Sequence, residues 1–140
     1  GLGKFVQLQA GFSSVTMTGR RPDVTIFCYP NCSTCKRAVA YLESRNIAFT
    51  YRNIKADRPS KQELGRIIEQ SGIDSKKFFN TSGQLYRSLG LKDKLPGLDT
   101  DQILDLLSSD GMLVKRPLLV CDATVLVGFR QAEWDAFFET

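Results

Sequence analysis

The stretch from Phe27 to Lys36 reads Phe-Cys-Tyr-Pro-Asn-Cys-Ser-Thr-Cys-Lys and contains a Cys-x-x-Cys motif. The apolar run from Val24 to Phe27 comes just before the motif, and its short length and β-forming residues predict a strand. The segment from Ala38 to Arg45 follows and is typical of a helix. The motif therefore lies where a strand turns into a helix.

The position of Cys32 predicts a reactive thiol. The first N–H groups of a helix have no partner within the helix, and their partial positive charge favours a thiolate over a thiol. Lys36 and Arg37 add positive charge one turn further along. Cys35 is placed to attack a mixed disulfide on Cys32. We expect Cys35, packed one turn into the helix, to keep a higher pKa and to react only after Cys32 is oxidised.

The other cysteine interpretations are structural. Cys35 shares a helical face with Val39 and Leu42, so it could simply pack there as a small apolar side chain. Cys28 and Cys121 fall within or at the ends of predicted strands, where free cysteine is ordinarily buried and inert. We therefore assign no role to Cys28 and Cys121 at this level.

The composition suits one globular domain, because the chain has 140 residues and 42% of them are hydrophobic. Residues 1–20 show no sustained periodicity and are interpreted as a leader outside the fold. Residues 21–140 then form the domain. The competing interpretation of the leader is an edge strand from Lys4 to Leu8.

Charge and residue usage exclude several classes of function. The net charge of +4 is compatible with small anionic substrates and is too weak for a dedicated nucleic-acid binder. No apolar run could cross a bilayer and no secretory signal is recognisable, so we expect a cytoplasmic protein, monomeric and without a membrane partner. The four cysteines and the absence of histidine argue against a metal site and against Cys-His hydrolases. In a reducing cytosol the motif is predicted to be redox-active.

Downstream of the motif, the run from Ile47 to Arg52 predicts a second strand and completes a βαβ unit. Ser60 and Glu63 have the spacing of a capping box, which predicts a helix that stops at Ser71-Gly72. Residues 73–110 indicate short helical pieces, with no strand among them.

Strand character returns near the C-terminus. The runs 117–121 and 124–127 are joined by an Asp122-Ala123 turn, which predicts an antiparallel hairpin. An amphipathic helix bearing Trp134 then ends the chain. The element order is βαβ, a helical insertion, and ββα, which is a thioredoxin-like layout.

Three separated segments carry a family resemblance: Tyr29 to Cys35, Phe78 to Gly83, and Lys115 to Leu118. With these segments in this order, the chain from about Val24 onward resembles the arsenate reductase and Spx superfamily. The resemblance implies an α/β fold with a four-stranded mixed sheet and a helical insertion between its second and third strands. It also implies a structural proline, Pro117, joined to Arg116 by a cis peptide bond.

The resemblance implies that Cys32 is the nucleophile, with Cys35 its redox partner and Arg116 beside it in the catalytic set. Family arginines that bind the oxyanion are only partly matched, because Asn80 stands where one is expected and Arg130 is merely close to another. Three residues of the motif, Asn31, Ser33 and Thr34, complete the expected substrate-binding set with Asn80 and Arg130.

Two functions follow from the resemblance. The first is a thiol-dependent oxidoreductase without a bound cofactor, acting on a small oxyanion or a disulfide. Its thiol reductant, as co-substrate, would be glutathione with glutaredoxin, or thioredoxin. The second is an Spx-like redox-switched regulator that binds the C-terminal domain of the RNA polymerase α subunit. Basic residues that Spx carries after the Asn80 position fall here on uncharged Ser82 and Gln84, which favours the enzyme.

Overall fold

The computed structural model describes residues 23–139, so the predicted leader at 1–20 and the alternative strand at 4–8 lie outside the described residues. The described chain alternates strands and helices in the expected order, with short 3₁₀ turns at Ser75–Phe78, Leu95–Gly97 and Gly111–Leu113. Its strands are β1 (Val24–Cys28), β2 (Thr50–Asn53), β3 (Leu118–Cys121) and β4 (Thr124–Val127). Its helices are α1 (Ser33–Ser44), α2 (Lys61–Ser71), α3 (Gln84–Ser88), α4 (Leu91–Lys94), α5 (Thr100–Ser109) and α6 (Gln131–Phe138).

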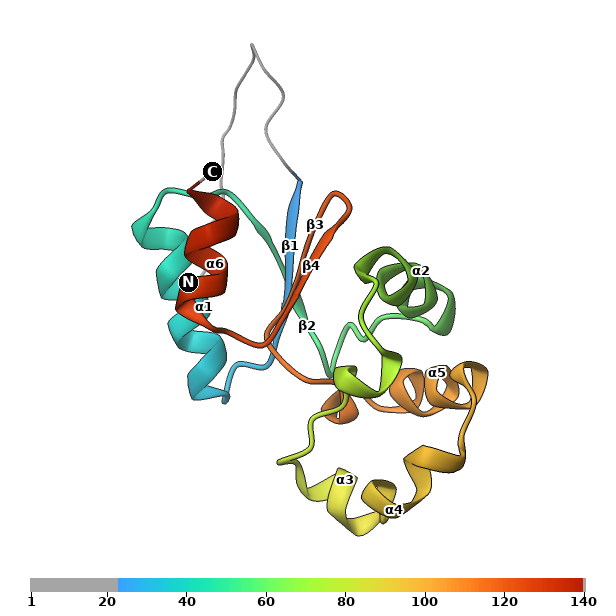
Figure 1. Ribbon diagram of the computed structural model, residues 1–140. Helices are drawn as coiled ribbons and strands as arrows, with labels where there is room; N and C mark the ends of the chain where they lie inside the picture. Colours follow the sequence, from blue (N-terminus) through green and yellow to red (C-terminus); the bar gives the residue numbers. More distant parts are fainter. Residues whose placement is uncertain (1–22, 140) are drawn as a thin grey trace.

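The strands form one mixed four-stranded sheet in the order β2-β1-β3-β4. β1 pairs in parallel with β2 and antiparallel with β3, and β3 pairs antiparallel with β4. The predicted thioredoxin-like fold, the C-terminal hairpin and the helical insertion between β2 and β3 are therefore confirmed (Figure 1). The Arg116-Pro117 peptide bond is cis, as expected.

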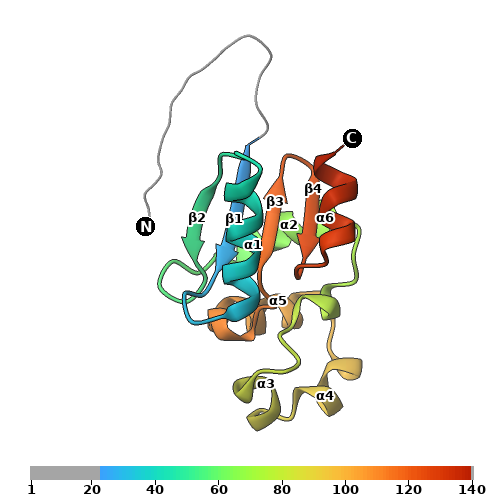
Figure 2. The same ribbon diagram turned by 90° about the vertical axis from the view of Figure 1, so that its left-hand side faces the viewer.

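The alternation of apolar residues along the central strands gives the sheet two buried faces. Ile26 and Cys28 of β1 pack with Leu42 of α1 and Trp134 of α6 in one apolar cluster. Phe27, between them in sequence, joins a second cluster on the other face with residues of α2 and α5. The two views show the same layering, with α1 and α6 over one face, α2 and α5 over the other, and α3 and α4 beyond the end of the sheet (Figures 1 and 2).

The second strand begins at Thr50 rather than at Ile47. The chain leaves α1 through Asn46, which has a positive φ of 58°, and the N–H of Ile47 donates to the carbonyl of Leu42. Ile47 and Phe49 pack against the α1 cluster before pairing with β1 starts. Local packing onto the helix thus uses the first residues of the predicted strand.

The cap of α2 is only half of the predicted capping box. The Ser60 hydroxyl accepts the Glu63 N–H at 3.0 Å, as expected. The Glu63 carboxylate instead forms an ion pair with Arg52 of β2. A reciprocal capping box does occur at α5, between Asp99 and Gln102, where the sequence analysis did not expect one.

One short antiparallel bridge ties the helical insertion to the start of β3. Phe79 pairs with Val114, and the flanking bonds run from the Asn80 N–H to the Leu113 carbonyl and from the Lys115 N–H to the Phe78 carbonyl, both at 2.7 Å. Between β2 and β3 no strand forms among these described residues, as predicted. The bridge holds Asn80 beside the segment that leads into Arg116.

Gly111 lets two connecting segments approach closely. A Cβ at Gly111 would lie 1.8 Å from the carbonyl oxygen of Ile54, the buried residue that follows β2. We predict that Gly111→Ala lowers the free energy of unfolding by about 2–3 kcal/mol, because backbone must move to admit the methyl group. Gly97→Ala is the matched control, since a Cβ there meets no atom within 4 Å. Urea unfolding of both variants checks this, and equal midpoints would contradict it.

Candidate functional site

The Cys-x-x-Cys motif lies at the sheet edge where β1 and β2 end and β3 begins. The chain turns after Cys28, and the N–H of Cys32 donates to the carbonyl of Tyr29 at 3.0 Å. Cys32 is the N-cap of α1 with extended backbone, and its carbonyl accepts the Lys36 N–H. Its side chain is half-buried, so the thiol at the helix start remains reachable from solvent.

Cys35 lies beneath Cys32 and is enclosed. Only 2% of Cys35 is exposed, and the N–H of Tyr29 donates to its sulfur at 3.4 Å. Cys28, at the end of β1, is fully buried and donates a side-chain hydrogen bond to the same sulfur. Cys32 contributes a further hydrogen bond. The Cys35 sulfur therefore has donors from the strand, the turn and the helix start.

These contacts make Cys35 an unusual thiol. The hydrogen bond from Cys28 is the main cause that lowers the pKa of Cys35 to about 6, against the opposing effect of burial. The Tyr29 N–H, the Cys32 thiol and the charge of Arg116 lower it further. The same hydrogen bond, with burial, raises the pKa of Cys28, so Cys28 stays protonated. The expectation that Cys35 keeps a higher pKa is wrong, because it considered only the helix and not the strand beneath it.

Arg116 is half-buried next to the cysteines. Its guanidinium carbon lies 5.6 Å from the centre of the Tyr29 ring, and its Nη1 donates to the carbonyls of Met112 and Val114 at 3.4 Å each. The Nε atom is buried and has no hydrogen-bond partner within the described chain. Arg116 thus brings a positive charge, with unused donor capacity, to the thiol site.

The remaining predicted residues lie around this centre to different degrees. Asn31 and Ser33 are exposed beside Cys32, and Thr34 accepts a hydrogen bond from Arg37. Arg130 is exposed at the start of α6, two residues after Gly128, whose N–H donates to the Pro117 carbonyl. Asn80 is half-buried in the insertion. No printed contact within residues 23–139 joins the side chains of Asn80 or Arg130 to the cysteines.

Tyr51 is a neighbour of the site that the sequence analysis did not identify. It pairs with Ile26 in the sheet, so it points to the same face as Cys28, and it is 42% exposed on the edge strand. Burial, followed by the charges of Cys28, Cys35 and Cys32, raises the pKa of its hydroxyl to about 12. The alternation of β2 could have found it, given the correct partner strand.

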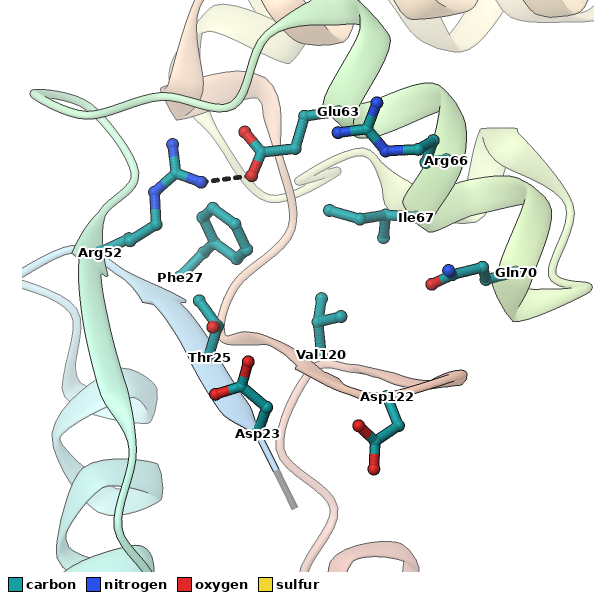
Figure 3. Close-up of a pocket in the computed structure, with 10 residues that line it drawn as sticks. All are labelled: Asp23, Thr25, Phe27, Arg52, Glu63, Arg66, Ile67, Gln70, Val120 and Asp122. Atoms are coloured by element: carbon teal, nitrogen blue, oxygen red, sulfur yellow. Dashed lines mark hydrogen bonds and ion pairs between the residues drawn. The ribbon is translucent and has the colours of Figure 1, made fainter. Parts of the chain in front are cut away.

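A cavity of about 320 Å³ lies on the opposite face of the sheet, between β1, β3 and α2 (Figure 3). Thr25, Phe27 and Val120 line its sheet side, and the ion pair between Arg52 and Glu63 closes one end. None of the predicted site residues lines it. This cavity is therefore separate from the thiol chemistry.

Two searches of residues 23–139 gave no feature. No group of three His, Cys, Asp or Glu side chains could hold a metal ion there. No helix of that range is both long and apolar enough to span a membrane.

A mixed four-stranded sheet with a Cys-x-x-Cys at the start of α1 and a cis proline at the same edge defines a thioredoxin-fold thiol protein. The sequence model of the ArsC family matches residues 27–137. The chain therefore belongs to the ArsC family.

Three similar proteins illustrate the range of that family. The uncharacterized protein YusI of Bacillus subtilis is 46% identical over 112 residues, which cover 80% of this chain and 95% of YusI. A Streptococcus mutans structure described as a possible arsenate reductase has a TM-score of 0.77 and 46% identity, and covers 84% of this chain and 100% of that one. The global transcriptional regulator Spx of Streptococcus agalactiae is 26% identical over 114 residues, 81% of this chain and 82% of Spx.

The lowered pKa of Cys35 can be measured directly. Ultraviolet absorbance of the reduced protein should show one thiolate appearing with a midpoint near pH 6, because Cys35 is protonated below its pKa and charged above it. Cys35→Ser should remove this step. Cys121→Ser is the control and should leave it, since burial raises the pKa of Cys121. A step near pH 6 that persists in Cys35→Ser would assign the charge to another cysteine.

Proposed function

We propose that the protein is a thiol-dependent oxidoreductase that reduces a disulfide substrate through Cys32 and Cys35. One observation supports this most strongly: a reachable thiol, Cys32, shares a hydrogen bond with an enclosed thiol, Cys35, whose charged form is stabilised. The first thiol can meet a substrate, and the second can only meet the first. This is the division of labour that a nucleophilic and a resolving cysteine require.

The proposed chemistry uses the atoms in that arrangement. Cys32 passes its proton to the Cys35 thiolate and attacks one sulfur of the substrate disulfide, which breaks the substrate S–S bond and forms a mixed disulfide. The departing thiolate takes the proton back from Cys35. Cys35 then attacks the Cys32 sulfur, forms the Cys32–Cys35 disulfide and releases the second half of the substrate as a thiolate. The substrate gains two electrons and the protein loses two.

The charged groups at the site favour a disulfide over arsenate. Arg116 is the guanidinium placed beside the thiols, whereas the Asn80 position is neutral. Each missing guanidinium removes up to two charge-assisted hydrogen bonds to an oxyanion, worth roughly 1.5–3 kcal/mol apiece. A disulfide substrate places no such demand, because attack at sulfur develops its charge on a single leaving thiolate. We therefore propose a small disulfide, such as glutathione disulfide, ahead of an oxyanion.

The proposed cycle needs a reductant. Two thiols must reopen the Cys32–Cys35 disulfide, and glutathione with glutaredoxin, or thioredoxin, would supply them. Arg116 and the exposed Lys36 near Cys32 give the site a positive character that suits anionic glutathione.

A second candidate is an Spx-like regulator, favoured by the similarity to Spx and by the intact Cys-x-x-Cys. In that case oxidation of Cys32 and Cys35 would change the affinity for the C-terminal domain of the RNA polymerase α subunit, and no turnover would be needed.

Trapping the intermediate tests the proposed roles. After addition of glutathione disulfide, Cys35→Ser should retain one glutathione on Cys32, since no resolving thiol remains. The wild-type chain should instead form an internal disulfide without an adduct, and Cys32→Ser should form neither. Intact-mass spectrometry with peptide mapping reads out all three, with Cys121→Ser as a control that behaves like wild type. An adduct on Cys28 or Cys121, or none in Cys35→Ser, would overturn the assignment.

Turnover separates the two candidate functions. With glutathione and glutaredoxin, or with thioredoxin, present to recycle Cys32, we expect repeated reduction of a small disulfide and much slower reduction of arsenate. A binding assay with the polymerase α C-terminal domain, run on reduced and oxidised protein, should show no redox-dependent affinity. Redox-dependent binding without turnover would replace the enzyme proposal with the regulator.

A further inference from the structure

Cys28 is a third cysteine at the thiol site, and the two-cysteine mechanism gives it no role. It is the last residue of β1, it is completely buried, and its carbonyl accepts the Ile54 N–H at 2.8 Å. Its thiol donates to the Cys35 sulfur from the sheet side, and the Tyr29 N–H reaches the same sulfur from the turn. Cys28 therefore lies directly beneath the resolving cysteine.

We propose that Cys28 is a positioning residue for the resolving step, whose thiol hydrogen bond keeps the negative charge on Cys35 while Cys32 is bound to substrate. This inference rests on the proposed function. It assigns a purpose to a buried cysteine that would otherwise only fill space in β1.

The environment explains why a donor is needed at this position. A buried thiolate with 2% exposure has lost most of its contact with water, so it requires donors from the protein. A hydrogen bond to a charged acceptor is roughly twice as strong as one between neutral groups. The chain has no histidine to serve as a base for Cys35. Cys28 stays protonated because its own pKa is raised, so it acts as a donor throughout the neutral range.

The resolving step itself is balanced. The Cys35 thiolate attacks the sulfur of Cys32 in the mixed disulfide, the Cys32–Cys35 bond forms, and the bond between Cys32 and the substrate sulfur breaks. The substrate half leaves as a thiolate and takes a proton from solvent. Cys28 keeps its proton and its sulfur is neither oxidised nor reduced.

Dithiobis(nitrobenzoate) separates the two steps with the full chain. The reagent releases one coloured thionitrobenzoate when the mixed disulfide forms on Cys32 and a second one when Cys35 resolves it. The second phase is intramolecular and independent of reagent concentration. Its rate as a function of pH reports the protonation of Cys35 while Cys32 is occupied.

The variants compare donors with non-donors at one position. Cys28→Ala and Cys28→Val remove the donor, and the second of these fills nearly the same space in the strand. Cys28→Ser keeps a hydroxyl donor. Cys121→Ala alters a buried cysteine that does not contact the site and should leave the profile unchanged.

The expected effect is a change of pH profile rather than a general loss of rate. If the pKa of Cys35 rose fully to the ~8.5 of free cysteine, the thiolate fraction near pH 6 would fall roughly 150-fold, while the higher nucleophilicity of a more basic thiolate would return roughly 13-fold. The resolving rate should therefore fall by up to about tenfold near pH 6 and be no slower above about pH 8. We expect the midpoint to rise by about one unit or more in Cys28→Ala and Cys28→Val, and to stay within about half a unit of wild type in Cys28→Ser.

The outcomes are distinguishable. Unchanged midpoints in both Cys28→Ala and Cys28→Val would overturn the inference, as would a shift in Cys28→Ser as large as theirs. A uniform rate loss at every pH would show a merely structural role and overturn it too. Failure of the first phase in wild type, with no adduct on Cys32, would instead overturn the proposed function.

Discussion

The site depends on the stabilisation of one buried negative charge, that of the Cys35 thiolate. Water reaches only 2% of this residue, so the protein must supply the stabilising contacts. They come from Cys28 at the end of β1, from the Tyr29 N–H in the turn, and from Arg116 before β3. These groups are far apart in sequence and meet because β1 lies between β2 and β3 with their site ends at one edge. The sheet order is therefore a precondition of the thiol chemistry.

The helices on the cysteine side keep that arrangement in place. Trp134 of α6 is fully buried and its indole N–H donates to the carbonyl of Gly128 at 3.1 Å. Tyr41 of α1 donates its hydroxyl to Asp135 of α6 at 2.6 Å, and its ring packs edge-on against Trp134. The C-terminal helix thus holds α1 over the sheet, and α1 carries Cys32 and Cys35. Substitutions in α6 should act on the thiols only through this packing.

Much of the fold could be predicted from the sequence because its signals are local. The apolar runs, the proline that opens β3 and the spacing of Ser60 and Glu63 each act over a few residues. The start of β2 was missed because Ile47 and Phe49 pack on α1, which is a tertiary effect. The site was predicted in the same uneven way. The helix-start position of Cys32 could be predicted from its neighbours, whereas the contact of Cys28 with Cys35 depends on which strand lies under the helix.

The central claim is that the reachable thiol reacts first although the enclosed thiol carries the stabilised charge. Iodoacetamide labelling of the reduced chain, followed over time by peptide mass spectrometry, tests it at each cysteine separately. The account predicts that Cys32 is alkylated first at neutral pH, and that Cys28, Cys35 and Cys121 stay unmodified until the protein unfolds. Alkylation of Cys35 or Cys121 ahead of Cys32 would contradict it.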